Sequence, residues 1–358
     1  MTRPGNHEPG GAGGAYQGAG VSIEAGETAV SLMKDAIAKA AGPEVIGGIG
    51  GFAGLFDASR LTRYRRPLLA TSTDGVGTKV VLAQRLGRYD TVGIDLVAMV
   101  VDDLVCCGAE PLFMTDYVVF GKLRPERAAQ IVAGVAAGCV QAGCALLGGE
   151  TAEHPGHLAP DDFDLAGAAT GVVEADAVLG PERVRPGDAV IALASSGLHS
   201  NGYSLARKIV ADAGLDLAAT PPELSRTLGE ELLAPTAIYA QACLDLAAAC
   251  DVRAFAHITG GGLASNVARV LPAGTGAVLH RGSWTPPAIF ALLAAQGRVA
   301  QPDMEQVFNM GVGMAAIVAP AHAGEAVRTL AASGIKAWPL GEVTPTPEGA
   351  HLAGTHPT

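Results

Sequence analysis

The nine residues 71–79 bring together the residue types that bind phosphate and metal. These are Asp74, Gly75, Gly77, Thr78 and Lys79. The apolar run 67–70 predicts a buried strand, so these groups would lie at its carboxyl end. A carboxylate suits a divalent cation, and glycines let backbone N–H groups approach an anion. The glycine and lysine spacing is not that of a Walker A loop. A glycine turn beside a surface lysine is the alternative for this stretch alone.

Three further carboxylates lie on segment 91–108, whose apolar residues recur at helical spacing. Asp95 and Asp102 are seven residues apart, which places them on one helix face roughly 10 Å apart along the axis. Asp103 projects about 80° from Asp95. A solvated face is the alternative. Because the rest of the helix is apolar, the pattern favours three cation ligands that face Asp74.

Residues 148–153 repeat this arrangement of glycines followed by a carboxylate. They end the predicted strand 145–148, and Glu150 is a candidate metal ligand. His154 and His157 follow, and a surface loop explains them better than a metal site does. Residues 47–52 contain four glycines, among them Gly48, Gly50 and Gly51. A nucleotide-binding loop and a flexible hinge both fit that composition.

Two clusters of hydroxyl groups and glycines precede predicted helices. The first contains Ser195, Ser196, His199, Ser200 and Asn201, and the second contains His257, Thr259, Gly260 and Gly261. Free N–H groups at a helix N-terminus bind phosphate, although capping alone would explain Ser200 or Asn201. Together with the acidic strand ends, the clusters indicate two anionic ligands bridged by metal. Phosphoryl transfer from ATP fits this pattern.

The whole-chain composition limits the class of protein. The 358 residues suggest two domains, and 49% apolar with 16% charged residues indicates a compact globular protein. The net charge is −11 and no basic run occurs, which disfavours nucleic-acid binding. No segment predicts a membrane span or secretory signal, so a cytoplasmic location is expected. The six cysteines fit small buried thiols better than disulfides or a zinc site.

The chain divides into a tail at 1–15, domains at 16–175 and 176–343, and a polar tail at 344–358. Helices and strands alternate in both halves, which predicts mixed α and β layers. Helices are predicted over 26–41, 91–108, 125–142, 203–213, 228–249, 262–270 and 286–296. Strands are predicted over 112–120, 145–148, 163–173, 189–194, 276–280, 314–318 and 337–343.

Eight motifs, taken in order, resemble the phosphoribosylformylglycinamidine cyclo-ligase family, also called aminoimidazole ribonucleotide synthetases. They lie at 47–52, 73–79, 93–99, 108–112, 148–153, 199–204, 257–262 and 308–314, and the resemblance extends from about residue 16 to 343. It implies an α+β fold of two mixed α/β domains. The amino-terminal domains would build a shared β-barrel across a homodimer, and each carboxyl-terminal domain would form an α/β layer.

The resemblance also implies a reaction. ATP would phosphorylate the formyl oxygen of formylglycinamidine ribonucleotide, and the ribose-bearing nitrogen would then attack that carbon. Ring closure would give 5-aminoimidazole ribonucleotide and release ADP and phosphate.

The family's functional residues can be carried over by position. Mg²⁺ would be held by Asp74, Asp103 and Glu150. ATP would be bound by Gly48, Gly50, Gly51, Asp74, Gly75, Gly77, Thr78, Lys79 and Asp95. The ribonucleotide would be bound by Ser195, Ser196, His199, Ser200, Asn201, Thr259, Gly260 and Gly261. Candidate catalysts are Lys79, His257 and His199.

The chain departs from the family pattern at several positions. Asp102 stands where Asn is usual, which adds a negative charge beside the expected metal site. His154 and His157 replace Met, and Gln17, Gly18 and Ser22 replace charged residues. The alternatives are another ATP-using enzyme of this architecture, such as selenophosphate synthetase or a small-molecule kinase, and a non-catalytic nucleotide-binding dimer module. The second would have lost its carboxylates, but Asp74, Asp103 and Glu150 are present.

Overall fold

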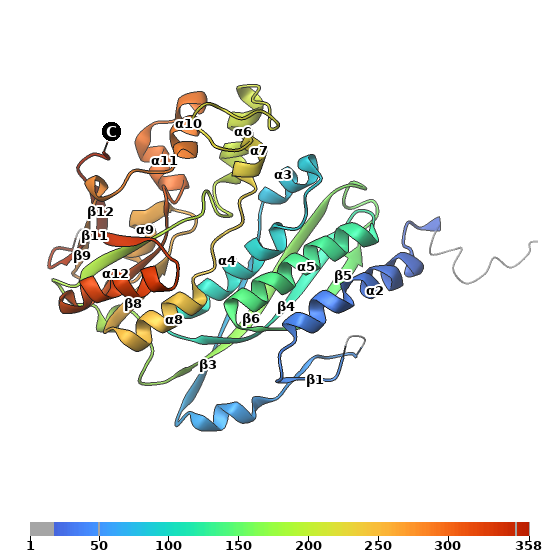
Figure 1. Ribbon diagram of the computed structural model, residues 1–358, viewed down its shortest axis with the longest axis horizontal. Helices are drawn as coiled ribbons and strands as arrows, with labels where there is room; N and C mark the ends of the chain where they lie inside the picture. Colours follow the sequence, from blue (N-terminus) through green and yellow to red (C-terminus); the bar gives the residue numbers. More distant parts are fainter. Residues whose placement is uncertain (1–17, 49–50, 348, 358) are drawn as a thin grey trace, which may run out of the picture.

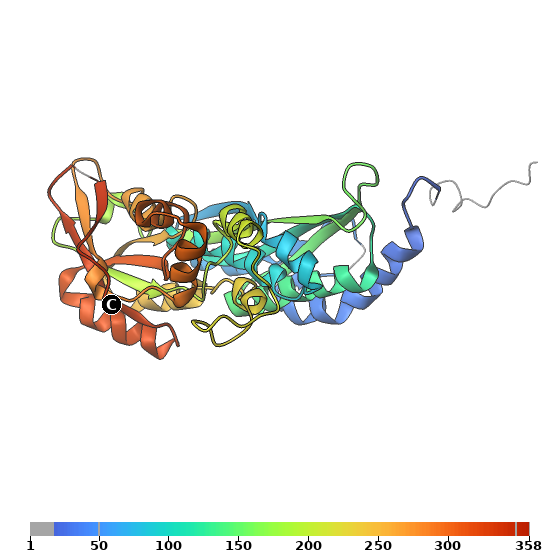
Figure 2. The same ribbon diagram turned by 90° about the horizontal axis from the view of Figure 1, so that it is seen from above.

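The computed structural model describes residues 18–48, 51–347 and 349–357. They form two α/β units that lie next to each other along the long axis of the molecule (Figures 1 and 2). The first has a four-stranded sheet of order β3-β6-β4-β5, and the second a six-stranded sheet of order β12-β9-β11-β7-β10-β8. The predicted two domains with mixed α and β layers are therefore confirmed. The predicted tail at 1–15, and the positions of Gln17 and Gly50, lie outside the described residues.

The first unit packs its long helices on one face of its sheet (Figure 2). Its elements are α2 (Ile23–Ala40), β1 (Val45–Ile46), β2 (Leu55–Phe56), β3 (Pro67–Gly75), α3 (Lys79–Leu86), α4 (Val92–Cys106), β4 (Glu110–Phe120), α5 (Pro125–Ala142), β5 (Ala145–Glu153) and β6 (Phe163–Glu174). Helices α4 and α5 pack so closely that a Cβ at Gly93 would lie 2.2 Å from the Ile131 carbonyl oxygen. Only glycine permits this approach, which holds α4 firmly over the sheet.

The opposite face of this sheet is open to solvent. Side chains alternate between the two faces of a strand, so Leu69, Thr71 and Thr73 share a face on β3. All three are exposed, as are Thr115 and Tyr117 on β4, and Leu69 is 65% exposed. A single chain therefore has an open sheet at this position, and the barrel expected across a homodimer stays a prediction.

The second unit is built around the buried strands β7 and β10. Its elements are β7 (Ala189–Ala194), α6 (Tyr203–Asp212), α7 (Leu228–Leu232), α8 (Ala240–Ala249), β8 (Val252–His257), α9 (Gly262–Ala268), β9 (Gly276–His280), α10 (Ala288–Gly297), α11 (Gln301–Val307), β10 (Val312–Val318), α12 (Ala323–Ala332), β11 (Ala337–Thr344) and β12 (Gly349–Ala353). Every residue of β10 is buried, since β7 and β8 flank it. Among the helices in the described ranges, none is long and apolar enough to cross a membrane.

Three predicted elements are corrected. The helix expected over 228–249 is two helices, α7 and α8, because Pro235 in the connecting segment cannot continue a helix. The strand expected over 145–148 continues to Glu153, because β4 pairs with it along that length. The tail expected over 344–358 contains β12, which pairs in parallel with β9 and packs Leu352 against the core of this unit.

Candidate active site

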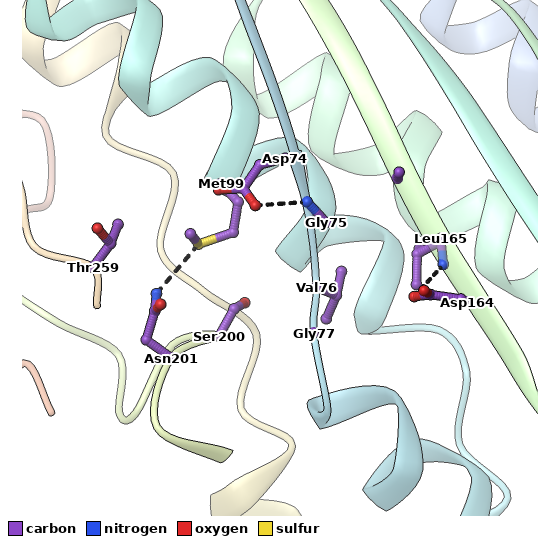
Figure 3. A pocket seen from close by; sticks show the side chains of 11 residues that line it. Asp74, Gly75, Val76, Gly77, Met99, Asp164, Leu165, Ser200, Asn201 and Thr259 are labelled. Carbon is purple, nitrogen blue, oxygen red and sulfur yellow. Dashed lines mark hydrogen bonds between the residues drawn. The ribbon is translucent and has the colours of Figure 1, made fainter. Parts of the chain in front are cut away.

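A cavity of about 400 Å³ lies where the two units meet (Figure 3). The first unit contributes the turn after β3, Met99 on α4 and the start of β6. The second unit contributes Ser200, Asn201 and Thr259 from two strand ends. The glycine-rich turn and part of each hydroxyl cluster predicted from sequence therefore line one cavity. A larger cavity of about 870 Å³ adjoins it, since Gly77 and Asp164 line both.

Asp74 and Asp103 form an acidic pair beside the cavity. The Asp74 carboxylate accepts a hydrogen bond from the Gly75 N–H at 2.7 Å. Burial raises the pKa of Asp74, and the charge of Asp103 raises it further, although the Gly75 hydrogen bond opposes the change. Ser72 donates to the second oxygen of Asp103 at 3.4 Å. Two neighbouring carboxylates are a donor set that a divalent cation would stabilise.

His257 completes this pair from the second unit. It is the last residue of β8, and its Nδ1 lies 2.9 Å from Asp103 Oδ1. Burial lowers the pKa of His257, but the Asp103 hydrogen bond and the charges of Asp102, Asp103 and Asp74 outweigh it, so the pKa is raised. Within the described residues its Nε2 has no hydrogen-bond partner. The predicted candidate His257 therefore lies beside two of the predicted metal ligands, Asp74 and Asp103.

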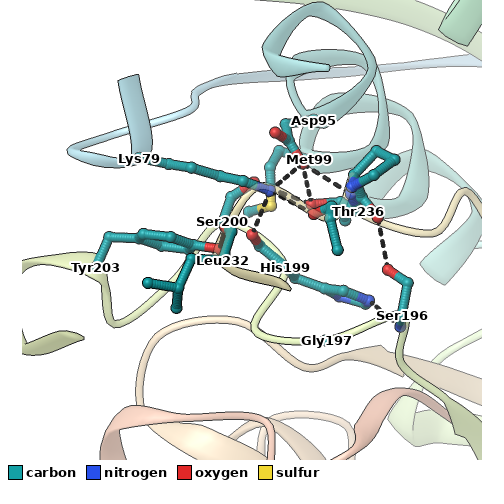
Figure 4. Close-up of polar contacts among 12 residues, drawn as sticks. Lys79, Asp95, Met99, Ser196, Gly197, His199, Ser200, Tyr203, Leu232 and Thr236 are labelled. Carbon is teal, nitrogen blue, oxygen red and sulfur yellow. Dashed lines mark hydrogen bonds and ion pairs between the residues drawn. The ribbon is translucent and has the colours of Figure 1, made fainter. Parts of the chain in front are cut away.

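Lys79 is not at the cavity surface. It is fully buried, and its Nζ donates to Asp95 Oδ1 at 2.8 Å, the His199 carbonyl at 2.9 Å and the Ala234 carbonyl at 2.7 Å (Figure 4). An ammonium has three donors, so all of them are used. In this arrangement Lys79 links the two units and has no donor left for ATP phosphates, so its expected role there stays a prediction without support from the geometry.

Asp95 and Asp102 bind backbone groups of the second unit. Asp95 accepts from the Thr236 N–H and hydroxyl, both at 2.7 Å, and Asp102 accepts from the Tyr239 N–H at 2.9 Å, next to the start of α8. Both carboxylates are fully buried, and burial raises the pKa of Asp102 to about 7. One oxygen of each carboxylate is taken by donors of the second unit, and neither residue lines the cavity. A shared cation with Asp74, and nucleotide binding by Asp95, stay predictions.

Glu150 does not join the acidic pair within one chain. Glu150 on β5 lies opposite Tyr117 on β4, and the same row across the sheet continues through Ala166 on β6 to Gly75 on β3. Asp74 precedes Gly75, so it lies in the neighbouring row. Glu150 therefore points to the open face and Asp74 to the face covered by α4. Three strand spacings, about 14 Å, also separate the two strands. Across the described ranges, no group of three or more acidic, His or Cys side chains could hold a metal.

Residues 49 and 50 of the glycine-rich segment 47–52 lie outside the described residues. Strand β1 ends just before the segment and β2 follows it, and a Cβ at Gly54 would lie 2.5 Å from the Leu147 carbonyl oxygen of β5. Gly48 and Gly51 are exposed and do not line the cavity in one chain. His154, which follows β5, lies 3.4 Å from the Tyr117 hydroxyl in an exposed position.

Only part of the predicted substrate loop, residues 195–201, faces the cavity. Ser195 donates to the Gly197 carbonyl, and Ser196 donates to the Pro235 carbonyl. His199 is buried, and its Nε2 accepts from the Ser196 N–H at 3.1 Å. Burial lowers the pKa of His199 far below its usual value, so the ring is neutral. The ring of His199 therefore stabilises the loop from inside and does not line the cavity, so its expected catalytic or substrate-binding role stays a prediction.

The second hydroxyl cluster turns sharply after β8. Thr259 lines the cavity, whereas Gly260 and Gly261 are exposed beside it. Asn266 donates to the carbonyls of Thr259, Gly260 and Gly262, which fixes the turn.

Sequence reasoning missed Met99, Asp164 and Thr236. Met99 and Asp164 line the cavity, but an apolar residue in an apolar helix and an acid in an alternating strand carry no local signal. The contact of Thr236 with Asp95 was not predicted, because segment 228–249 was expected to be one helix. The proline in that segment was the available signal.

Two family models match the chain. The N-terminal domain of AIR synthase related proteins matches residues 57–173, and the C-terminal domain matches residues 185–353. The chain is 49% identical over 337 residues to a phosphoribosylformylglycinamidine cyclo-ligase of Acetivibrio thermocellus, covering 94% of this chain and 99% of that protein. It is 52% identical over 330 residues to a protein of the same name from Geobacillus kaustophilus, covering 92% and 95%.

Solved structures of more distant proteins share the fold. Hydrogenase maturation protein HypE in complex with ATP matches with a TM-score of 0.63, covering 91% of this chain and 88% of that chain. The sequence identity is 18%, so this likeness shows the fold alone.

Proposed function

The chain belongs to the phosphoribosylformylglycinamidine cyclo-ligase family of AIR synthase related proteins, and we propose which of its residues carry out the cyclo-ligase reaction. It catalyses the ATP-dependent ring closure of formylglycinamidine ribonucleotide to 5-aminoimidazole ribonucleotide. One observation carries the assignment of the site: the acidic pair Asp74 and Asp103 and the polar residues Ser200, Asn201 and Thr259 come from different units and meet at one cavity.

The first unit would receive ATP. Gly75 and Gly77 line the cavity, and the backbone N–H of Gly77 can donate to a phosphate oxygen, whereas that of Gly75 binds Asp74. Asp74 and Asp103 would hold Mg²⁺, which when bound neutralises charge on the transferring phosphoryl group. The raised pKa of Asp74 and its closeness to Asp103 support this donor set.

The second unit would hold the ribonucleotide. The Ser200 hydroxyl and the Asn201 amide would orient it so that its formyl oxygen faces the γ-phosphate, and Thr259 would close the far side. The neighbouring cavity, lined by Arg85, Arg127 and Arg207, could take an anionic end of either ligand.

His257 would manage protons and charge next to the acidic pair. Its Nδ1 is held by Asp103, and the raised pKa favours the imidazolium form near neutral pH. An imidazolium at this position would stabilise negative charge on the formyl oxygen and the phosphoryl oxygens while the phosphate ester forms. Once the ribose-bearing nitrogen has attacked, the phosphate can leave and the ring is closed.

A homodimer would complete the site. The open face of the first sheet presents Leu69, Tyr117 and Glu150, and a second copy of the same face would bury it. Glu150 points to the open face, and Gly48 and Gly51 do not line the cavity of their own chain, so we assign these residues to the cavity of the partner. We place the domain boundary between residues 175 and 176, directly after β6. A cytoplasmic location and the lack of nucleic-acid binding stay predictions.

The test is ATP hydrolysis with Mg²⁺, measured with and without formylglycinamidine ribonucleotide. Hydrolysis should depend on the ribonucleotide and release one ADP per 5-aminoimidazole ribonucleotide. A rate that does not respond to the ribonucleotide would contradict the assignment. Phosphorylation of a different small acceptor without ring closure would favour a small-molecule kinase of the same fold.

A further inference from the structure

We propose that Lys79 is a positioning residue, which fixes the substrate loop 195–201 of the second unit against the ATP-side turn 74–78 of the first. The inference rests on the proposed function, because it concerns the placement of the two substrates. Sequence patterns place this lysine beside phosphate, but the structure gives it a different set of partners (Figure 4).

The partners of Lys79 leave no donor for a ligand. Its three N–H groups bind one carboxylate and two carbonyls at 2.7–2.9 Å, and the side chain is fully buried. A neutral amine has only two N–H groups and would leave one acceptor unpaired. Burial lowers the pKa of Lys79, whereas the Asp95 carboxylate opposes this change and favours the charged form.

The substrate loop needs such an anchor at His199. This residue has a φ of +64°, a left-handed conformation that is unfavourable for a residue with a side chain. Its carbonyl accepts directly from Lys79, and the next two residues, Ser200 and Asn201, line the cavity. A change at the Lys79 contact would therefore move the residues proposed to hold the ribonucleotide.

The loop has a second anchor, but it lies within its own unit. Asn309 donates to the Gly197 carbonyl at 2.9 Å and accepts from the Ser195 hydroxyl at 3.1 Å. These bonds fix the shape of the loop without fixing its distance from the first unit. Lys79 supplies the stronger bond from the first unit to this loop, beside a weaker contact of the Asn201 amide with Met99 Sδ at 3.9 Å. Lys79 follows Gly77 and Thr78 directly and begins α3.

The free-energy cost of burying an unpaired charge determines which variants can fold and be compared. Lys79→Met alone would leave Asp95 charged and buried without a cation, which is strongly destabilising and can prevent folding. The double variant Lys79→Met/Asp95→Asn removes both charges, and the amide oxygen still accepts from Thr236. Asp95→Asn alone is the matched control, because Lys79, once it has lost its counter-ion, can release its proton and still donate its two remaining N–H groups to the two carbonyls.

The experiment compares wild type, Asp95→Asn and the double variant by steady-state kinetics, thermal unfolding and calorimetric titration of Mg²⁺–ATP. We expect kcat/KM for the ribonucleotide to fall about 100-fold in the double variant and less than about threefold in the control, because misplacement by about 1 Å is enough for such a loss. Binding of Mg²⁺–ATP should change little, since Asp74 and Gly75 are held on β3 by β6.

Two results would overturn the proposal. One is a double variant with near-normal kcat/KM, and the other is an equal loss of ATP and ribonucleotide binding, which would indicate a purely structural role. If the wild type shows no ribonucleotide-dependent hydrolysis, the proposed function fails. Hydrogen exchange then still decides the present inference: residues 195–201 should exchange faster in the double variant than in Asp95→Asn, and equal rates would refute it.

Discussion

The two sides of helix α4 use the same residue type for different tasks. Asp103 is 46% exposed and binds His257 beside the cavity, whereas Asp95 and Asp102 are fully buried and accept from backbone N–H groups of the second unit. Asp102 and Asp103 are neighbours in sequence, so a rotation of about 100° separates the two environments. The charge pattern of a helix therefore does not by itself identify a metal site, because the packed neighbour decides which carboxylates stay available.

The two faces of the first sheet show the same division. Asp74 points toward α4 and Glu150 toward the open face. Both are carboxylates next to a glycine near a strand end, since Asp74 precedes Gly75 and Glu150 follows Gly149. Alternation along a strand separates them in one chain.

Asp74→Asn should have the largest effect on the cavity side. It removes one carboxylate of the acidic pair, so Mg²⁺-dependent turnover should fall about 100- to 1,000-fold, as for the loss of one preorganised electrostatic group. Elution volume in gel filtration should not change. A near-normal rate would remove Asp74 from the metal site.

Asp103→Asn and Asp102→Asn test the division of α4 directly. We expect Asp103→Asn to lower kcat at least about 30-fold, since His257 loses its charged partner as well as the cation. Asp102→Asn should change kcat less than about threefold, because an amide oxygen can still accept from the Tyr239 N–H. Equal effects of the two substitutions on kcat would contradict the division.

Mixing two inactive variants tests whether the faces of two chains form one site. Asp74→Asn and Glu150→Gln homodimers should each be inactive. After subunit exchange at equal amounts, half of the dimers are mixed and each has one intact site, so activity should recover to about one quarter of wild type. Recovery is expected only for a site shared between chains. No recovery, with exchange verified by mass spectrometry, would place Glu150 elsewhere.

Asp116→Asn should affect stability rather than catalysis. Burial raises the pKa of Asp116 to about 7, and a Cβ at Gly149 would lie only 1.9 Å from this carboxylate. The folded state therefore binds a proton more tightly than the unfolded state, so stability is lost as pH rises from about 4 to 7. The variant should be more stable by about 2–4 kcal/mol at pH 8 and equal to wild type below pH 4 in urea unfolding. A difference that persists below pH 4 would rule out this cause.

Residues that start or end helices and strands explain which features could be predicted from sequence. The helix 125–142 was predicted with its observed bounds, because Pro125 begins it and Gly143 ends it in a left-handed conformation. Asp74, Ser200, Asn201 and Thr259 were found because strand ends rich in glycine and hydroxyl groups form a local pattern.

The roles of Lys79, Asp95 and His199 could not be predicted in this way. Lys79 and Asp95 bind a carbonyl and an N–H group of segment 233–239, more than 130 residues away from Asp95 and predicted to be helical, and His199 depends on its own bond to Lys79. Burial between two units changed a phosphate-binding pattern into a structural contact.

The most direct test is a crystal structure with Mg²⁺, a non-hydrolysable ATP analogue and the ribonucleotide. We expect oxygen atoms of Asp74 and Asp103 to lie about 2.1 Å from Mg²⁺, with Lys79 still bound to Asp95 and to the carbonyl of His199. Mg²⁺ bound by Asp95 or Asp102, or the Lys79 ammonium on a phosphate, would contradict this expectation.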